Sequence, residues 1–264
     1  MLEHSAQNGI RTRARRSDSY CAARDMQSMA HSHPPSPSPP VSPSPTPPAS
    51  DRVRLRRKRE RGSYDRRMID AILDEALIAH LGIVEEDGQP FVIPTLHARR
   101  GDLVYCHGSV ASRTLRMLAA GAPVCLTVSL LDGLVLARSA MHHSANYRSA
   151  MLVGTARCVE DPDEKHAAFQ AIVEHIVPGR WPEVRAPTDN ELAATSVLAI
   201  PIEEASAKAR TGPPQDDEED YALGAWAGVI PLTPTAGAPA PDPRLRAGID
   251  PPAYVTDYLR PSSP

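Results

Sequence analysis

Large aromatic side chains are scarce in this chain of 264 residues, in which Phe and Trp together number four. We therefore expect part of its apolar surface to be buried against a second copy of the chain. Long apolar runs are missing as well. No stretch approaches the roughly 18 consecutive apolar residues of a membrane helix, and the first residues lack the apolar segment of a secretory signal. We expect neither a membrane span nor secretion.

Cysteine is also sparse, and its spacing excludes two common uses. The four cysteines (Cys21, Cys106, Cys125 and Cys158) form no C-x-x-C pair. Three of them lie in apolar, strand-like stretches, where Cys behaves as a small buried hydrophobe. This usage favours a reducing cytoplasm over a disulfide framework.

Two phosphate-binding signatures are absent: the Gly-x-x-x-x-Gly-Lys loop and the Gly-x-Gly-x-x-Gly fingerprint. A basic run does occur at 52–61 (RVRLRRKRER), which opens the question of a nucleic-acid or anionic surface. No basic patch recurs, and the net charge of the chain is −3. A solvated lead-in to the first helix is therefore favoured, and nucleic acid is an unlikely partner.

Composition divides the chain into three parts. Residues 34–48 read PPSPSPPVSPSPTPP, which offers no apolar surface to offset the entropy of ordering. We predict a disordered Pro/Ser-rich tail over 1–50, a basic lead-in over 51–62 and one folded domain over 63–260.

Hydrophobic periodicity predicts a mainly β domain with flanking α-helices. Helical spacing covers 65–79 and 161–179, a short helix fits 108–121, and Thr188-x-x-Glu191 is a capping box. Asp87-Gly88 and Asp132-Gly133 are turn signals. Strands are expected at 80–86, 91–98, 103–108, 123–131, 134–140, 146–160 and 196–209, with irregular chain after 209. Short turns between most strands indicate a small antiparallel barrel.

The stretch HGSVASR (107–113) is the best candidate for binding a phosphate. A strand ends there, Gly108 gives backbone freedom, and Ser109 can cap the helix that follows. Ser112 and Arg113 then fall near the first turn. Hydroxyls, helix N–H groups and a guanidinium together suit a phosphate. An ordinary Ser-capped helix with an exposed Arg explains the same residues equally well.

The segment GQPFVIPTLHARRGDLVYCHGSVASRTLRML resembles the flavin-nucleotide-binding branch of the pyridoxamine 5′-phosphate oxidase-like proteins. Gly88-Gln89-Pro90, Tyr105 and Ser112-Arg113 match its motifs, and so do the later stretches DGLVLARSAMHHSANYRSAMLVGTA and SAKARTGPP. The resemblance implies an FMN-binding split β-barrel of Greek-key type. It also implies a homodimer with two FMN molecules at the subunit interface.

Under this resemblance the strand VIPTLH lies along the flavin, and Pro94 interrupts its ladder and frees backbone groups for the ring. His97 and Tyr105 would flank the ring, and Lys208, Arg210 and Trp226 would close the site, from the same subunit or the other. The expected cofactor-binding residues are Pro94, Thr95, Leu96, His97, Tyr105, His107, Gly108, Ser109, Ser112, Arg113, Lys208, Arg210 and Trp226.

One feature of the vitamin B6 oxidases is missing. They carry an Arg-x-His triplet near the C-terminus for the substrate phosphate, and no such triplet follows residue 200. The sequence thus favours an FMN-dependent oxidoreductase of unassigned substrate, with a small molecule as electron donor or acceptor. A non-catalytic flavin-binding or storage protein and a haem-binding split barrel remain alternatives. No side chain is singled out as a catalytic acid or base.

The histidine pair in MHHSANYRSA (141–150) raises the question of a metal site. Adjacent residues of an extended strand point to opposite sides, so at most one of His142 and His143 would face a shared centre. No carboxylate or Cys stands at ligand spacing beside them, and no metal ligand is predicted. We expect a bend between two barrel strands here. In Tyr147-Arg148-Ser149, a structural and a functional role for the Arg stay equally open.

Overall fold

The computed structural model describes residues 46–259. The predicted Pro/Ser-rich tail lies almost entirely outside the described residues. Within them, no helix is long and apolar enough to cross a membrane.

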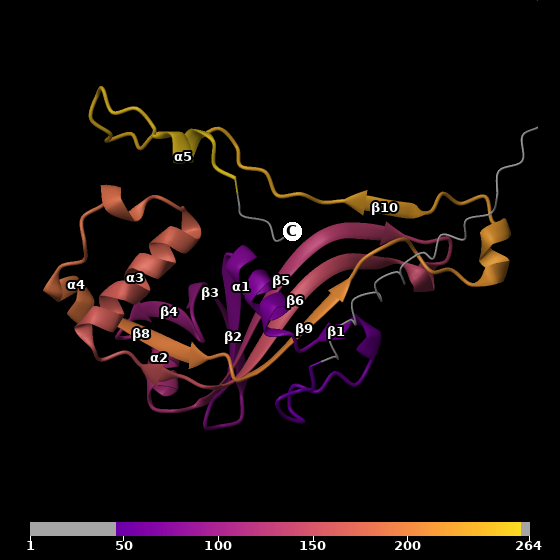
Figure 1. The fold of residues 1–264 in the computed structure, drawn as a ribbon, viewed down its shortest axis with the longest axis horizontal. Helices are drawn as coiled ribbons and strands as arrows, with labels where there is room; N and C mark the ends of the chain where they lie inside the picture. The colour runs from indigo at the N-terminus through magenta and orange to yellow at the C-terminus, as the bar shows by residue number, and fades with distance from the viewer. Residues whose placement is uncertain (1–45, 260–264) are drawn as a thin grey trace, which may run out of the picture. The chain divides into compact units, whose positions relative to one another are not determined.

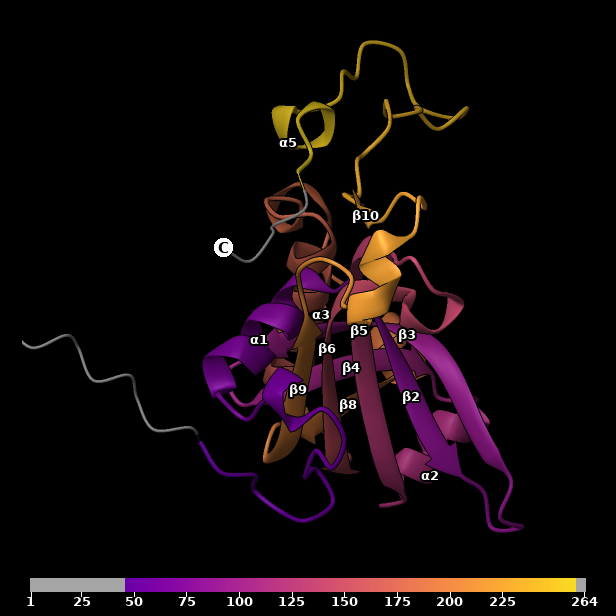
Figure 2. The ribbon, with the colours of Figure 1, turned by 90° about the vertical axis from the view of Figure 1, so that its right-hand side faces the viewer.

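One antiparallel sheet of ten strands forms the body of the domain (Figures 1 and 2). Its order runs β1 (Gly62–Ser63), β9 (Glu204–Arg210), β6 (Ser144–Thr155), β5 (Pro123–Leu136), β2 (Ile78–Val84), β3 (Pro90–Arg100), β4 (Leu103–Ser109), β8 (Thr195–Pro201) and β7 (Arg157–Cys158), and β10 (Gly228–Pro231) pairs with β5. The predicted fold class, a mainly β split barrel with flanking helices, is confirmed.

Helices and short 3-10 turns flank this sheet. The α-helices are α1 (Arg66–Glu75), α2 (Arg113–Ala119), α3 (Pro162–Ile176), α4 (Asp189–Ala194) and α5 (Ala253–Thr256), and the 3-10 turns are η1 (Arg59–Arg61), η2 (Ala140–His142), η3 (Trp181–Glu183) and η4 (Glu218–Ala222). The predicted capping box is confirmed, since both Thr188–Glu191 hydrogen bonds form at the start of α4. The Asp87-Gly88 turn is confirmed too, with Gly88 at φ 85°.

The core has two layers, and β4 and β8 separate them. Inside the barrel, α1 and α2 pack on the strands through residues such as Leu73, Leu118 and Leu126, all 0% exposed. Outside it, α3 covers Tyr105 and Val197. Because side chains alternate along a strand, Leu198 and Ile200 of β8 enter the barrel core while Val197 faces α3. This burial on both faces explains the unbroken apolar run of β8.

The predicted turn at Asp132-Gly133 is wrong. β5 passes straight through these residues with a bulge between Leu131 and Gly133, and β6 pairs with it on both sides of the bulge. β10, which the sequence pattern missed, pairs with Gly133 through Leu136 on the other edge. Asp132 is held by Arg148, at 2.7 Å between carboxylate and Nη2. Neighbouring strands therefore override the local turn signal, and β5 and β6 continue as a long arm toward η4 (Figure 1).

The predicted single strand over 196–209 is also wrong, because the chain divides at residues 202–203 into β8 and β9. β8 pairs with β4, whereas β9 pairs with β6 on the far side of the sheet. The apolar pattern continues across the break because both strands contribute to the same barrel core. Periodicity alone gave no signal that the chain changes partners there.

Candidate functional site

An open strand edge lies where β3 loses one of its neighbours. β2 pairs with residues 90–96 of β3, but β4 pairs only with residues 97–100. Over residues 90–96, β3 therefore has a described strand on one side only. Pro94 lies in this open part, and Val92 is 67% exposed. The expectation of an edge or local opening at Pro94 is confirmed.

The turn after β4 begins beside this edge. β4 keeps β8 as its partner up to Ser109 while it leaves β3, and α2 then starts at Arg113. Gly108 packs closely against α2, since a Cβ at this position would lie 2.6 Å from Cδ1 of Leu115 and that side chain would have to shift. Ser112 caps α2 by accepting from the backbone N–H of Leu115, at 3.4 Å. The sequence-based placement of the cap at Ser109 is wrong; the Ser109 hydroxyl instead accepts from the N–H of Ala111.

Arg113 connects α2 to the open edge of β3. Its guanidinium carbon lies 4.8 Å from the ring centre of Phe91, in β3, and its Nε lies 2.7 Å from Oε1 of Glu85. The contact with Glu85 is an ion pair without the alignment of a hydrogen bond. The Arg113 side chain stays 61% exposed. An exposed cation thus stands at one end of an unpaired strand edge.

Three other predicted cofactor residues contact α3, and His97 among them also contacts α1. His97 is 0% exposed, its Nε2 is 3.0 Å from the carbonyl oxygen of Leu73, and its ring centre is 5.0 Å from that of His175. The hydroxyl of Tyr105 donates to Glu164 at 2.8 Å. Burial, followed by this hydrogen bond, raises the pKa of Tyr105 to about 12.

The third, His107, packs against Phe169 of α3, with ring centres 5.6 Å apart. Burial lowers the pKa of His107 below its usual value. Its Nδ1 is buried without a hydrogen-bond partner among the described residues. Alternation along β4 explains the position, because Cys106 faces the barrel core and its neighbours on either side face α3.

The remaining predicted residues lie across the sheet from Arg113. Lys208 and Arg210 belong to β9, which β6, β5 and β2 separate from β3. Lys208 donates to the carbonyl oxygen of Arg57 at 3.3 Å, and Arg210 is 6% exposed. Trp226 is 68% exposed and lies against Gly228 at the start of β10. Within one chain these three do not reach the open edge, so their predicted role stands only as a contribution from a second copy.

The MHHSANYRSA segment forms η2 and the first half of β6. Arg148 pairs with Glu75 of α1 and with Asp132 of β5, so its role in the described structure is to connect helix and arm. The Nδ1 atoms of His142 and His143 each lie 2.9 Å from a group of Ser139, its hydroxyl and its carbonyl oxygen respectively.

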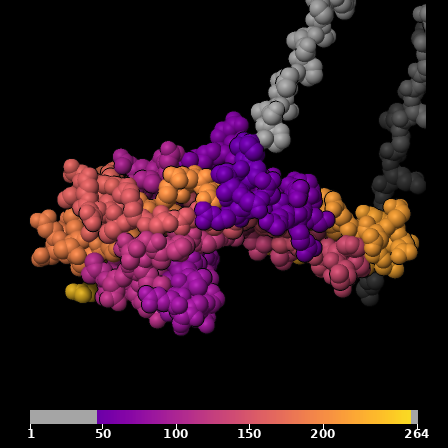
Figure 3. Space-filling model, turned by 90° about the horizontal axis from the view of Figure 1, so that it is seen from below, coloured from indigo at the N-terminus to yellow at the C-terminus, as the bar shows by residue number. Residues whose placement is uncertain are grey.

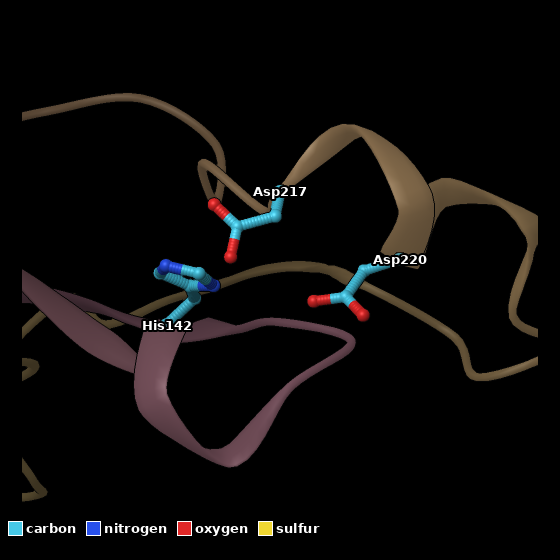
Figure 4. A group of neighbouring side chains, drawn as sticks. All are labelled: His142, Asp217 and Asp220. Atoms are coloured by element: carbon cyan, nitrogen blue, oxygen red, sulfur yellow. The ribbon is translucent and has the colours of Figure 1, made fainter.

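A second cluster at the tip of the arm escaped sequence reasoning. His142, Asp217 and Asp220 each place one ligand-type atom within 4.8 Å of the others, from segments about 75 residues apart in the chain (Figure 4). Such a set can hold a divalent cation. Asp217 and Asp220 are remote from His142 in sequence, so ligand spacing along the chain does not indicate this cluster. The acidic run QDDEED was the one available signal.

Comparison with known proteins agrees with the family resemblance of the sequence and with the split-barrel fold. The sequence model of the family described as pyridoxamine 5′-phosphate oxidase matches residues 65–209, more than half of the chain. The flavocytochrome Anf3 from Azotobacter vinelandii is 43% identical; the match covers 80% of this chain and 98% of that one, with a TM-score of 0.75. The FAD and haem binding protein from Mycobacterium smegmatis is 41% identical, with coverages of 75% and 96% and a TM-score of 0.71. No curated protein matches. This chain therefore belongs to the pyridoxamine 5′-phosphate oxidase family.

Proposed function

We propose that this chain is a flavin-binding redox protein that holds the flavin along the open edge of β3. The observation that carries the proposal is the exposed Arg113 guanidinium, 4.8 Å from Phe91 of that same edge. A flavin needs a site for its phosphate, a flat wall and a few backbone groups for the polar rim of its ring. Arg113 and the α2 turn would hold the phosphate, and residues 92–96 would lie along the ring.

The residues present fit such a group. Arg113 and the Ser112 hydroxyl offer charge and hydrogen bonding at the start of α2. On the side away from β2, residues 90–96 of β3 have no described strand beside them, so backbone groups on that side are available to a ligand. When bound, the flavin would supply hydride or electron transfer, and the chain would orient it and exclude water. We propose an oxidoreductase that takes a small molecule as electron donor or acceptor, working as a cytoplasmic homodimer.

The identity of the flavin is part of the proposal. The family resemblance favours FMN, whereas a relative of 41% identity binds FAD by its name. Both share the ring, the ribityl chain and the first phosphate, which is the portion that the β3 edge and Arg113 would contact. Release of the chromophore from the purified protein, followed by chromatography, separates the two. A colourless protein that gains no visible absorbance on incubation with FMN or FAD would refute the proposal.

Haem is a second candidate ligand, because both relatives described above carry it by name or by type. His143 is the best-prepared residue for it. Its Nδ1 lies 2.9 Å from the carbonyl oxygen of Ser139, which can only accept, so Nδ1 donates and Nε2 is left as the unprotonated ligand nitrogen. His97, fully buried with Nε2 on Leu73, is a poor candidate.

Haem titration tests this second candidate. A Soret band should form with the purified protein and should be lost in His143→Ala. The matched control is His80→Ala, since His80 is an exposed histidine on β2. Retention of the band in His143→Ala, or its equal loss in the control, would contradict the assignment.

A further inference from the structure

A small polar cavity lies between the basic lead-in and the end of β9, away from the proposed flavin edge. Its volume is about 240 Å³, and its lining residues are Glu60, Arg61, Ala209, Arg210, Thr211 and Gln215. The two walls are about 150 residues apart in sequence. β1 joins them directly after Arg61 by pairing with Ala207 and Lys208 of β9.

Arg210 is a buried cation that forms no ion pair with a carboxylate of residues 46–259. The residue is 6% exposed, and its guanidinium donates to Oδ1 of Asn146, to the carbonyl oxygen of Gly212 at 3.3 Å and to that of Pro213 at 3.0 Å. All three acceptors are neutral. Those three bonds leave two of the five guanidinium N–H donors without an acceptor among the described residues. Burying a charge without a counter-charge is costly, and a bound anion would remove that cost.

Arg61 adds a second positive charge to the same cavity. Burial lowers the pKa of Arg210, and the charge of Arg61 lowers it further. Glu60 also lines the cavity but forms no ion pair with a described residue. Two guanidinium groups and one carboxylate thus line the same cavity, and the net positive charge of this lining suits an anion between the two arginines.

The rest of the lead-in strengthens the positive potential around this cavity. Arg57, Lys58 and Arg59 form no ion pair with a described residue, whereas Arg52 pairs with Glu204. Figure 3 shows the indigo lead-in exposed on the surface of this face. Lys58 is the one described non-glycine residue with positive φ, at 52°, directly before η1. The lead-in cations that form no described ion pair therefore lie at residues 57–61, next to or in the cavity wall, whereas those at residues 52–56 are paired.

We propose that this cavity binds the phosphate group of a small phosphorylated molecule between Arg61 and Arg210. Guanidinium forks match phosphate oxygens bidentately, and Thr211 and Gln215 offer neutral hydrogen-bonding groups in the same lining. The volume lies below the roughly 300–1,000 Å³ of sites for drug-sized ligands, which suits a phosphate with little body attached. β6, β5 and β2 separate β9 from the open edge of β3, so this site goes beyond the proposed flavin function.

A nucleic-acid backbone would bind differently. It needs a strip of available cations that follow successive phosphates. Within the lead-in, Glu204 takes Arg52, and Asp51 takes both Arg54 and Arg56. Arg61 is the described cation of the lead-in that lines the cavity, where it faces Arg210, and one such pair favours a single phosphate over a strand.

Inorganic phosphate is the probe, titrated calorimetrically into the purified full chain against sodium chloride at equal ionic strength. Arg61→Gln is the informative variant, because Arg61 is only half-buried and makes no described ion pair. Arg54→Gln is the matched control from the same segment, paired with Asp51 at 2.6 Å. Saturating the parent chain with FMN tests independence from the flavin edge, because free phosphate can otherwise also bind at Arg113.

We expect Arg61→Gln to weaken phosphate binding by at least about tenfold, the loss of one charge-assisted contact. Arg54→Gln and the FMN-saturated parent chain should bind phosphate within about twofold of the parent chain. Equal affinities of Arg61→Gln and Arg54→Gln would overturn the proposal, as would phosphate binding no tighter than chloride. Binding of single-stranded DNA that excess phosphate does not displace would assign the lead-in to nucleic acid instead.

Discussion

Replacing Arg113 with Gln should weaken FMN binding by about tenfold while leaving the fold intact. The substitution keeps most of the side-chain volume and removes the charge proposed to meet the flavin phosphate. Hydrogen bonds to charged groups contribute about 1.5–3 kcal/mol. Because the Arg113 side chain is 61% exposed, water screens the interaction and the lower end applies. About 1.4 kcal/mol corresponds to a tenfold change in affinity.

Glu85 provides a test in the opposite direction. Its carboxylate lies 2.7 Å from Nε of Arg113, so it competes with a phosphate for the guanidinium and repels it. Glu85→Gln should therefore tighten FMN binding. The Arg113 side chain is 61% exposed and that of Glu85 16%, and a pair screened by water on one side contributes about 1 kcal/mol, so the gain should be about fivefold. A protein in which the phosphate binds elsewhere would show neither change.

Quenching of FMN fluorescence during titration measures both effects. Arg116→Gln is the control, since Arg116 is an exposed arginine on the same helix with no described ion pair. The affinity of the parent chain should fall with added salt, and that of Arg113→Gln should fall less. Equal dissociation constants for Arg113→Gln and Arg116→Gln would refute the placement of the phosphate at the start of α2.

Three further predictions concern the framework. Cys106 is 0% exposed and burial raises the pKa of its thiol to about 12, so a thiol reagent should label it only after unfolding; labelling of the native protein at Cys106 would contradict this. Burial lowers the pKa of His107, so the folded protein binds fewer protons at this residue than the unfolded chain, and the free energy of unfolding should fall as pH drops below about 6.5. In urea titrations, the free energy of unfolding of His107→Phe should fall less steeply with decreasing pH. An unchanged pH dependence in this variant would contradict the prediction. Arg148→Met should lower the free energy of unfolding by about 2–3 kcal/mol, because the carboxylates of Glu75 and Asp132 would lose the cation between them. The control Arg157→Met removes an exposed ion pair and should cost less than about 1 kcal/mol. Equal losses in the two variants would show that Arg148 does not hold the arm.

Several features of the fold could be predicted from local sequence chemistry. The capping box at Thr188, the turn at Gly88 and the edge character of Pro94 follow from hydrogen-bonding capacity within a few residues, and each is present. The predictions that were wrong concern residues whose conformation depends on strands distant in sequence. Asp132-Gly133 reads as a turn until β6 and β10 pair with both edges of β5.

The candidate site divides in the same way. Gly108, Ser112 and Arg113 are close in sequence, and the α2 turn brings them together as expected. His97 and Tyr105 were assigned to a flavin by family resemblance. The structure places Tyr105 beneath α3 and His97 in contact with both α1 and α3, helix positions that strand periodicity does not specify. The proximity of His142 to Asp217 and Asp220, and that of Arg61 to Arg210, arises from pairing between distant segments. No local pattern predicts such contacts.

Hydrogen exchange followed by mass spectrometry, with and without FMN, tests the central claim most directly. Flavin along the open edge of β3 should slow backbone exchange at residues 90–96 and 109–115, because those amides would be covered or newly hydrogen-bonded. Protection confined to residues outside those two segments, or absent from both of them, would contradict the placement of the flavin.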